Sequence, residues 1–187
     1  MLSAQAQFQE NLKRVRELGG LAVAVQSLTT SAIDVSDLWR SQIVLVVSAL
    51  DYFIHELVRL GMIECSKGTR AKTDAYLRFQ MPLSATESAM AGSAHEIWIG
   101  EIVRERHSWQ SFQDPDKLAD AIRLMSAVKL WESVGIELGG QPKDIKTRLE
   151  LIVDRRNQIA HEADLDPTNP GARWPINWPL VDDTQSL

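Results

Sequence analysis

The chain has 187 residues, of which 44% are hydrophobic and 24% are charged, and its formal net charge is -5. This composition is typical of a single globular domain over residues 1–187 and excludes an intrinsically disordered chain. The net negative charge excludes a general attraction to nucleic acid or acidic membranes, so any anion site must be a local patch. The single cysteine, Cys65, excludes disulfides within the chain and zinc sites built from cysteine clusters.

The N-terminal segment, MLSAQAQFQENLKRVREL, is amphipathic and carries charges of both signs. It lacks the continuous apolar core of a signal peptide, and no apolar run approaches the length that spans a membrane. We therefore expect a cytoplasmic protein without a membrane partner, and the single cysteine fits a reducing compartment.

Helical periodicity dominates the first half of the chain. The first helix is expected to end at Gly19-Gly20, and the second is the most apolar. The length of this second segment, and its lack of an internal turn residue, favour a buried helix over a buried strand. Ser84 and Ser93 can each cap a further helix. The predicted helices of this half cover residues 3–18, 36–64, 73–80 and 94–109, with another beginning at Ser84.

The second half contains clear helix boundaries. Asp114-Pro115 is a start signal, and the helix that follows is expected over 116–138, ending at Gly139-Gly140. Pro142 then opens a helix over 143–163. The sequence predicts an all-α fold with its core over about residues 30–165, followed by an irregular tail rich in proline and tryptophan over 166–187.

Arg156 lies within the apolar stripe of this last helix. Leu149, Ile152, Val153 and Ile159 all fall within roughly 60° of it on an ideal helix. A buried charge without a partner costs several kcal/mol, so Arg156 must be paired or must face a cavity. One interpretation is a structural ion pair with Asp51 or Glu56 of the second helix. The other is an anion site, in which Arg156 holds a phosphate and His161 moves protons.

The segment RNQIAH, near the end of an all-helical chain, resembles the hallmark of the HEPN superfamily, R-x(4–6)-H with a polar residue directly after the arginine. The matching residues are Arg156, Asn157 and His161. The resemblance extends to DLWRSQIVLVVSALDYFIHELV, residues 37–58, and to LELIVDRRNQIAHEADLDP, residues 149–167. Together these blocks are similar to the bacterial branch called RiboL-PSP-HEPN, over most of residues 30–180.

This resemblance implies a bundle of four to five helices with short accessory helices, which forms a homodimer so that two arginine–histidine motifs line one cleft. It implies a metal-independent endoribonuclease that uses no cofactor and cleaves RNA in a toxin–antitoxin or antiphage defence system. An antitoxin or another defence protein is then a possible partner. The alternative is a non-catalytic HEPN module that binds RNA or a partner protein and uses Arg156 as a structural ion pair.

The family's roles can be carried over to this chain. Arg156 would neutralise the scissile phosphate, His161 would act as general acid or base, and Asn157 would orient the histidine or the phosphate. Attack by the ribose 2′-hydroxyl gives a cyclic phosphate and needs only proton transfer and charge stabilisation. However, Arg156 and His161 are roughly 140° apart on an ideal helix, so they converge only if the helix loosens or a second subunit contributes. Relatives modified with AMP carry a tyrosine where this chain has Ala163.

Several further residues are candidates for supporting roles. Asp51 and His55 share a helix face with Ser48, but a mid-helix serine without an oxyanion hole is a poor nucleophile. We predict that Asp51 and His55 either support the site by pairing with Arg155 or Arg156 or form a hydrogen-bonded seam between helices. The predicted RNA-binding residues are Lys146, Arg148 and Arg155, although a solvated basic face explains them equally well.

Histidine and tryptophan complete the sequence predictions. His95 and His107 have no metal-ligand spacing, so no metal site is predicted, and both are expected to be half-exposed. Trp174 and Trp178 are expected to attach the tail to the bundle or to contact a partner, and stacking on RNA bases is a less favoured alternative. The tryptophans expected in the core are Trp39, Trp98, Trp109 and Trp131.

Overall fold

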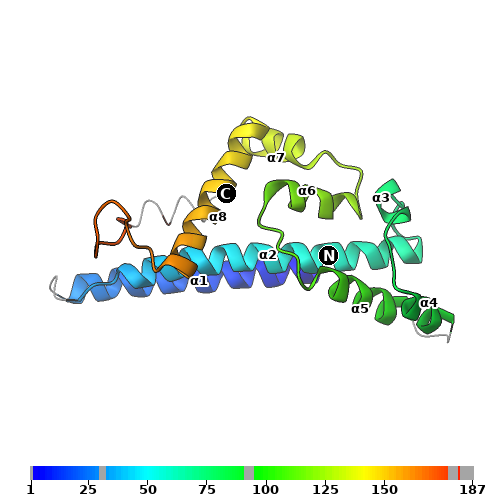
Figure 1. Ribbon diagram of the computed structural model, residues 1–187, viewed down its shortest axis with the longest axis horizontal. Helices are drawn as coiled ribbons and strands as arrows, with labels where there is room; N and C mark the ends of the chain where they lie inside the picture. The colour runs from blue at the N-terminus through cyan, green and yellow to red at the C-terminus, as the bar shows by residue number, and fades with distance from the viewer. Residues whose placement is uncertain (1, 30–32, 91–94, 177–180, 182–187) are drawn as a thin grey trace. The chain divides into compact units, whose positions relative to one another are not determined.

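The computed structural model is all-helical across the residues that it describes, which are 2–29, 33–90, 95–176 and 181 (Figure 1). Within these residues the only β pairing is an isolated bridge between Leu165 and Arg173, so the predicted all-α class is confirmed. No helix in this described part is long and apolar enough to cross a membrane. The helices are α1 (Leu2–Leu28), α2 (Ser36–Lys67), α3 (Asp74–Leu77), α4 (Leu83–Met90), α5 (His95–His107), α6 (Pro115–Arg123), α7 (Leu130–Leu138) and α8 (Pro142–Glu162).

The chain divides into two compact units, each formed from two separate stretches of sequence. The unit that contains residues 6–50 and 147–187 is called the motif unit, because it holds Arg156 and His161. The unit that contains residues 1–5 and 51–146 is called the middle unit. A single domain over 1–187 stays a prediction.

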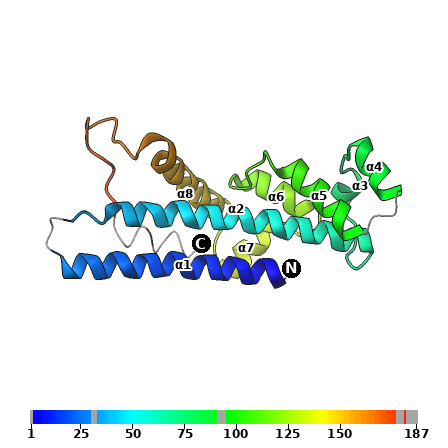
Figure 2. The ribbon, with the colours of Figure 1, turned by 90° about the horizontal axis from the view of Figure 1, so that it is seen from below.

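The core of the motif unit joins three helices. In this unit α1 and the first part of α2 lie side by side and antiparallel (Figures 1 and 2). Ile159 of α8 packs against their shared apolar cluster. The last turns of α8 are therefore held against α1 and α2 by apolar burial. The buried residues of the cluster are Ala22, Val35, Trp39, Ile43 and Val181.

The middle unit contains the remainder of α2 and the helices α3 to α7, with α4 packed on α5 and α6 packed on α7. The hydroxyl of Thr73 accepts a hydrogen bond from Tyr76 N at 2.9 Å and donates one to the carbonyl of Arg123 at 2.8 Å. This one residue therefore caps α3 and links it to the end of α6.

Local signals correctly predicted several helix boundaries. The Asp114 side chain accepts hydrogen bonds from the backbone of Asp116 and Lys117, both at 2.9 Å, and Pro115 is the first residue of α6. Gly139 ends α7 in the left-handed conformation, with φ of 66°. Pro142 begins α8 as predicted.

Tertiary packing explains the two largest errors in the predicted helix boundaries. α1 continues through Gly19-Gly20 to Leu28, since this extension brings Ala22 into the buried cluster. That burial outweighs a glycine cost of about 1 kcal/mol per residue. The expected helix over 116–138 is two helices, α6 and α7, separated by residues 124–129. Within this break Met125 is buried, and its Cβ lies 2.7 Å from the position of a Cβ added at Gly61.

The tryptophans only partly follow the prediction. Trp39 is buried, and Trp98 and Trp131 are half-buried. Trp109 is 74% exposed, so its placement in the core was wrong. This residue lies two positions after His107, the last residue of α5, where no helical face directs it inwards. Trp178 lies outside the described residues.

Candidate functional site

Arg156 is half-buried in α8 and has no carboxylate partner among the described residues. Its Nη1 donates to Oδ1 of Asn157 at 2.9 Å. Its Nε is buried without a hydrogen-bond partner in the described part of the chain. Asn157 therefore holds the guanidinium in place without neutralising its positive charge, and no described residue supplies a negative charge. A guanidinium in this state can bind an anion.

His161 is exposed and lies in the last turn of α8, which continues to Glu162. The helix therefore does not loosen between Arg156 and His161, and the two side chains leave an ideal helix roughly 140° apart. Asn157 and His161 are four residues apart on one face. The arginine and the histidine can converge by two routes, a loosened helix or a second copy of the chain. The helix does not loosen before His161. A second copy of the chain is the route that remains.

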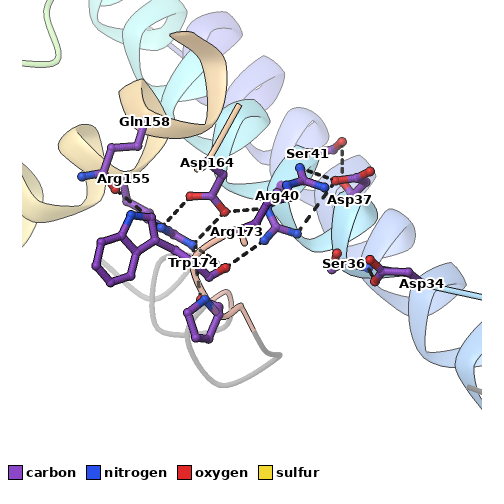
Figure 3. A network of polar contacts seen from close by, with 11 residues as sticks. Asp34, Ser36, Asp37, Arg40, Ser41, Arg155, Gln158, Asp164, Arg173 and Trp174 are labelled. Atoms are coloured by element: carbon purple, nitrogen blue, oxygen red, sulfur yellow. Dashed lines mark hydrogen bonds and ion pairs between the residues drawn. The ribbon is translucent and has the colours of Figure 1, made fainter. Parts of the chain in front are cut away.

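Arg155, and not Arg156, makes the buried ion pair of this helix (Figure 3). Its Nη1 lies 2.6 Å from Oδ1 of Asp164, and its Nη2 donates to Oδ2 at 2.9 Å. Burial lowers the pKa of the Arg155 guanidinium below its ordinary value, and the Asp164 carboxylate acts in the opposite direction. The predicted RNA-binding residue Arg155 is therefore bound within the motif unit.

Arg40 and Asp164 are neighbours of the candidate site that the sequence interpretation missed. Arg40 is 4% exposed and Asp164 is fully buried. Arg40 Nε donates to Asp164 Oδ2 at 2.5 Å, and its Nη2 donates to the Trp174 carbonyl at 2.8 Å (Figure 3). One carboxylate thus binds two arginines from α2 and α8. A charged residue inside the most apolar helix was the signal, the same anomaly that singled out Arg156.

Asp51 and His55, predicted to support the site, belong to the middle unit. Oδ1 of Asp51 accepts a hydrogen bond from the backbone of Phe112 at 2.6 Å and lies 3.9 Å from His55 Nε2. The His55 ring packs against Phe112 with centroids 4.5 Å apart. These contacts give both residues a structural role within their own unit.

Glu56 was the other carboxylate considered as a partner for Arg156. It binds Arg59, with Arg59 Nη2 2.7 Å from Oε2, and Arg104 lies 3.4 Å from Oε1. The hydrogen bond from Arg59 holds the pKa of Glu56 below its ordinary value. Glu56 is therefore already neutralised inside the middle unit.

The two remaining predicted RNA-binding residues differ in their surroundings. Lys146 Nζ donates to Asp116 at 2.6 Å within the middle unit. Arg148 is half-buried in α8, in the motif unit. Lys146, Arg148 and Arg155 are all half-buried.

The histidines outside the motif depart from expectation. His107 is 4% exposed rather than half-exposed, and its ring meets Phe112 edge-on at 5.2 Å. Burial, helped by His55 and Arg106, lowers the pKa of His107 to about 4. The side chain of His95 is not among those described. Within the described residues, no three His, Cys, Asp or Glu side chains are grouped to hold a metal ion.

The hydroxyl of Ser48 donates to the carbonyl of Val44 in its own helix at 2.8 Å. This bond is a common way for a mid-helix serine to satisfy its hydroxyl, and it gives the residue no feature of a nucleophile.

Comparisons of the chain with protein-family models, with curated proteins and with solved structures found no match.

Proposed function

We propose that this chain is a HEPN-type, metal-independent endoribonuclease that acts as a homodimer on RNA. The observation that carries the proposal is the state of Arg156, a half-buried guanidinium without a carboxylate partner among the described residues. Its neighbour Arg155 has a full ion pair, so the missing counter-charge is specific to the motif arginine. A phosphate would supply that counter-charge.

The proposed reaction needs only groups that the chain provides. A ribose 2′-oxygen attacks the adjacent phosphorus, and the bond from phosphorus to the 5′-oxygen breaks, leaving a 2′,3′-cyclic phosphate and a 5′-hydroxyl. One histidine accepts the proton of the 2′-hydroxyl, and a protonated histidine donates a proton to the leaving oxygen. Arg156 stabilises the charge that develops on the phosphoryl oxygens, and Asn157 holds its fork. In a dimer, the two copies of His161 can divide the two proton transfers.

The biological setting proposed with this activity is a toxin–antitoxin or antiphage defence system. Uncontrolled RNA cleavage stops growth, so expression of the wild-type chain should arrest cells, whereas His161→Ala should not. A partner protein that blocks the exposed His161 would then act as the antitoxin.

The direct test incubates RNA with the wild type, Arg156→Ala and His161→Ala in the presence of EDTA. Controls are Arg16→Ala, which removes an exposed arginine of α1, and Glu162→Ala, which changes the exposed neighbour of His161. We expect cleavage by the wild type and both controls, and loss of about 100-fold or more in each motif variant. Equal cleavage by a folded His161→Ala would reject the proposed site.

The second candidate is a non-catalytic module that binds RNA or a partner protein. Its specific support is that α8 stays helical to Glu162, so one chain alone does not bring Arg156 and His161 together. This candidate predicts RNA binding that weakens in Arg156→Ala, without cleavage by any variant.

A further inference from the structure

The end of α8 has an unusual backbone. Ala163 has φ of 53° and Asp164 has φ of 59°, so two consecutive residues other than glycine are left-handed. Alanine rarely adopts this conformation, because its Cβ then approaches the following carbonyl oxygen, whereas aspartate adopts it more readily. Surrounding interactions must therefore hold this turn in place, and the turn begins two residues after His161.

Asp164 supplies those interactions through its backbone and its side chain. Its N–H donates to the carbonyl of Gln158 at 3.1 Å, which closes the end of the helix. Its fully buried carboxylate accepts a hydrogen bond from Arg40 Nε at 2.5 Å and another from Arg155 Nη2 at 2.9 Å. Hydrogen bonds between charged groups are the strongest that side chains form, and these two come from different helices.

The same residues also fix the segment that follows the turn. Trp174 N donates to the carbonyl of Asp164 at 2.9 Å, and the Trp174 carbonyl accepts Arg40 Nη2 at 2.8 Å. Arg173 Nη2 lies 2.6 Å from Asp37 Oδ1 of α2. Figure 3 shows these contacts as one network around the Asp164 carboxylate.

We propose that Arg40, Arg155 and Asp164 form a clamp that positions His161 by holding the left-handed turn after α8. This inference rests on the proposed function for its catalytic consequence. The last turn of a helix lacks part of its hydrogen bonding and frays easily, and His161 is exposed in that turn. An exposed side chain there has a defined position only if the backbone after it is fixed. Arg40, Arg155 and Asp164 are positioning residues, since none is proposed to touch RNA.

The first test measures the clamp without activity. In Asp164→Asn we expect backbone amides at the end of α8 to exchange with solvent about tenfold faster, because the two guanidinium groups lose their carboxylate. Amides in the first half of α8 should be unchanged. The matched control is Asp166→Asn, which removes a carboxylate of the same loop that binds only Thr168 among the described side chains. Unchanged exchange in Asp164→Asn would overturn the clamp.

The second test measures catalysis. In Asp164→Asn we expect kcat to fall about 10- to 100-fold with KM within about twofold, because misplacing a proton-transfer group slows chemistry rather than binding. Arg40→Lys keeps a positive charge but loses the fork that joins Asp164 to Trp174, so it should show a smaller loss of the same kind. This conservative variant also serves if Asp164→Asn does not fold.

A rescue variant separates positioning from general stability. Glycine adopts the left-handed conformation without cost, so Ala163→Gly should hold the turn even when the clamp is weak. We expect Ala163→Gly to restore part of kcat in the Asp164→Asn background, and absence of rescue would count against the proposal. Faster exchange with unchanged kcat would overturn the positioning of His161. Absence of cleavage by the wild type would reject the nuclease itself, while exchange would still report on the clamp.

Discussion

At the scale of single residues, two adjacent arginines in α8 have opposite environments. Arg155 contacts both oxygens of the buried Asp164 carboxylate, whereas the polar partner of Arg156 among the described residues is the amide oxygen of Asn157. Residues one apart on a helix point about 100° from each other, so one can face a carboxylate while the other faces away from it. The structural role and the proposed catalytic role are thus divided between neighbours.

This division predicts different effects of the two alanine substitutions on stability. Arg155→Ala should lower the free energy of unfolding by about 3 kcal/mol, because it removes one of the two cations that neutralise a buried carboxylate. Arg156→Ala should lower it by about 1 kcal/mol or less, because Arg156 has no ion pair among the described residues. Urea denaturation of both variants measures the difference. A larger loss in Arg156→Ala would mean that Arg156 is a structural residue.

His107 is the second residue whose environment decides a measurable property. It is buried between aromatic rings, and its Nδ1 has no hydrogen-bond partner in the described part of the chain. Its folded-state pKa of about 4 lies below the ordinary value of 6.5. The unfolded chain therefore takes up a proton at higher pH than the folded chain does.

The stability contributed by neutral His107 should be fully present above about pH 6.5 and lost as the pH falls towards 4. A pKa difference of this size corresponds to about 3 kcal/mol. In His107→Phe, which keeps an aromatic ring in this site, the free energy of unfolding should fall much less between pH 6.5 and pH 4. The midpoint of urea unfolding, measured as a function of pH, tests this prediction. The control is His161→Ala, which keeps His107 and should therefore lose stability in acid as the wild type does.

At the scale of elements, tertiary packing decides where helices continue and where they break. α1 continues past two glycines because the residues beyond them reach a buried cluster, while α6 ends where Met125 approaches Gly61 of α2. Glycine is thus tolerated in α1, whereas α2 requires it at Gly61 because Met125 packs there.

Two glycine substitutions should therefore have opposite effects. A Cβ at Gly20 would meet no atom within 4 Å, so Gly20→Ala should stabilise the fold by about 0.5–1 kcal/mol. A Cβ at Gly61 would lie 2.7 Å from Met125 Cβ, so Gly61→Ala should destabilise it by about 1–3 kcal/mol. Thermal unfolding of the pair gives both signs, and stabilisation by Gly61→Ala would show that Met125 moves aside freely.

At the scale of the whole molecule, the predicted site residues are distributed over two units. Arg156, Asn157, His161, Arg155 and Arg148 belong to the motif unit, whereas Asp51, His55 and Lys146 belong to the middle unit. The middle-unit residues have hydrogen bonds or ion pairs within their own unit, and the proposed chemistry is argued from the residues of the motif unit.

A composite site predicts complementation between inactive variants. Arg156→Ala and His161→Ala are each expected to be inactive, but mixing them after partial unfolding and refolding should form heterodimers that contain one intact Arg–His pair. RNA cleavage should then reappear in the mixture. An inactive mixture in which heterodimers have formed would contradict a site that needs only one Arg156 and one His161 from separate chains.

Much of the fold followed from the sequence alone. The all-α class, the start of α6 at Asp114-Pro115, the end of α7 at Gly139 and the start of α8 at Pro142 depend on local chemistry. These signals act only on residues within a few positions in the sequence. Asp114 caps a helix with its side chain, Pro115 and Pro142 fix φ with their rings, and Gly139 is free to adopt a positive φ. The motif of Arg156, Asn157 and His161 was also visible as a pattern on one helix.

The tertiary structure decided what depends on residues distant in sequence. Arg40 and Asp164 are 124 residues apart, and no local pattern shows that they share a hydrogen bond. Asp164 also binds Arg155, whereas Arg156 has no carboxylate partner among the described residues. The continuation of α1 and the break before α7 likewise depend on buried contacts between separate helices. Propensity is worth about 1 kcal/mol per residue, and long-range burial and ion pairing outweigh it wherever the two conflict.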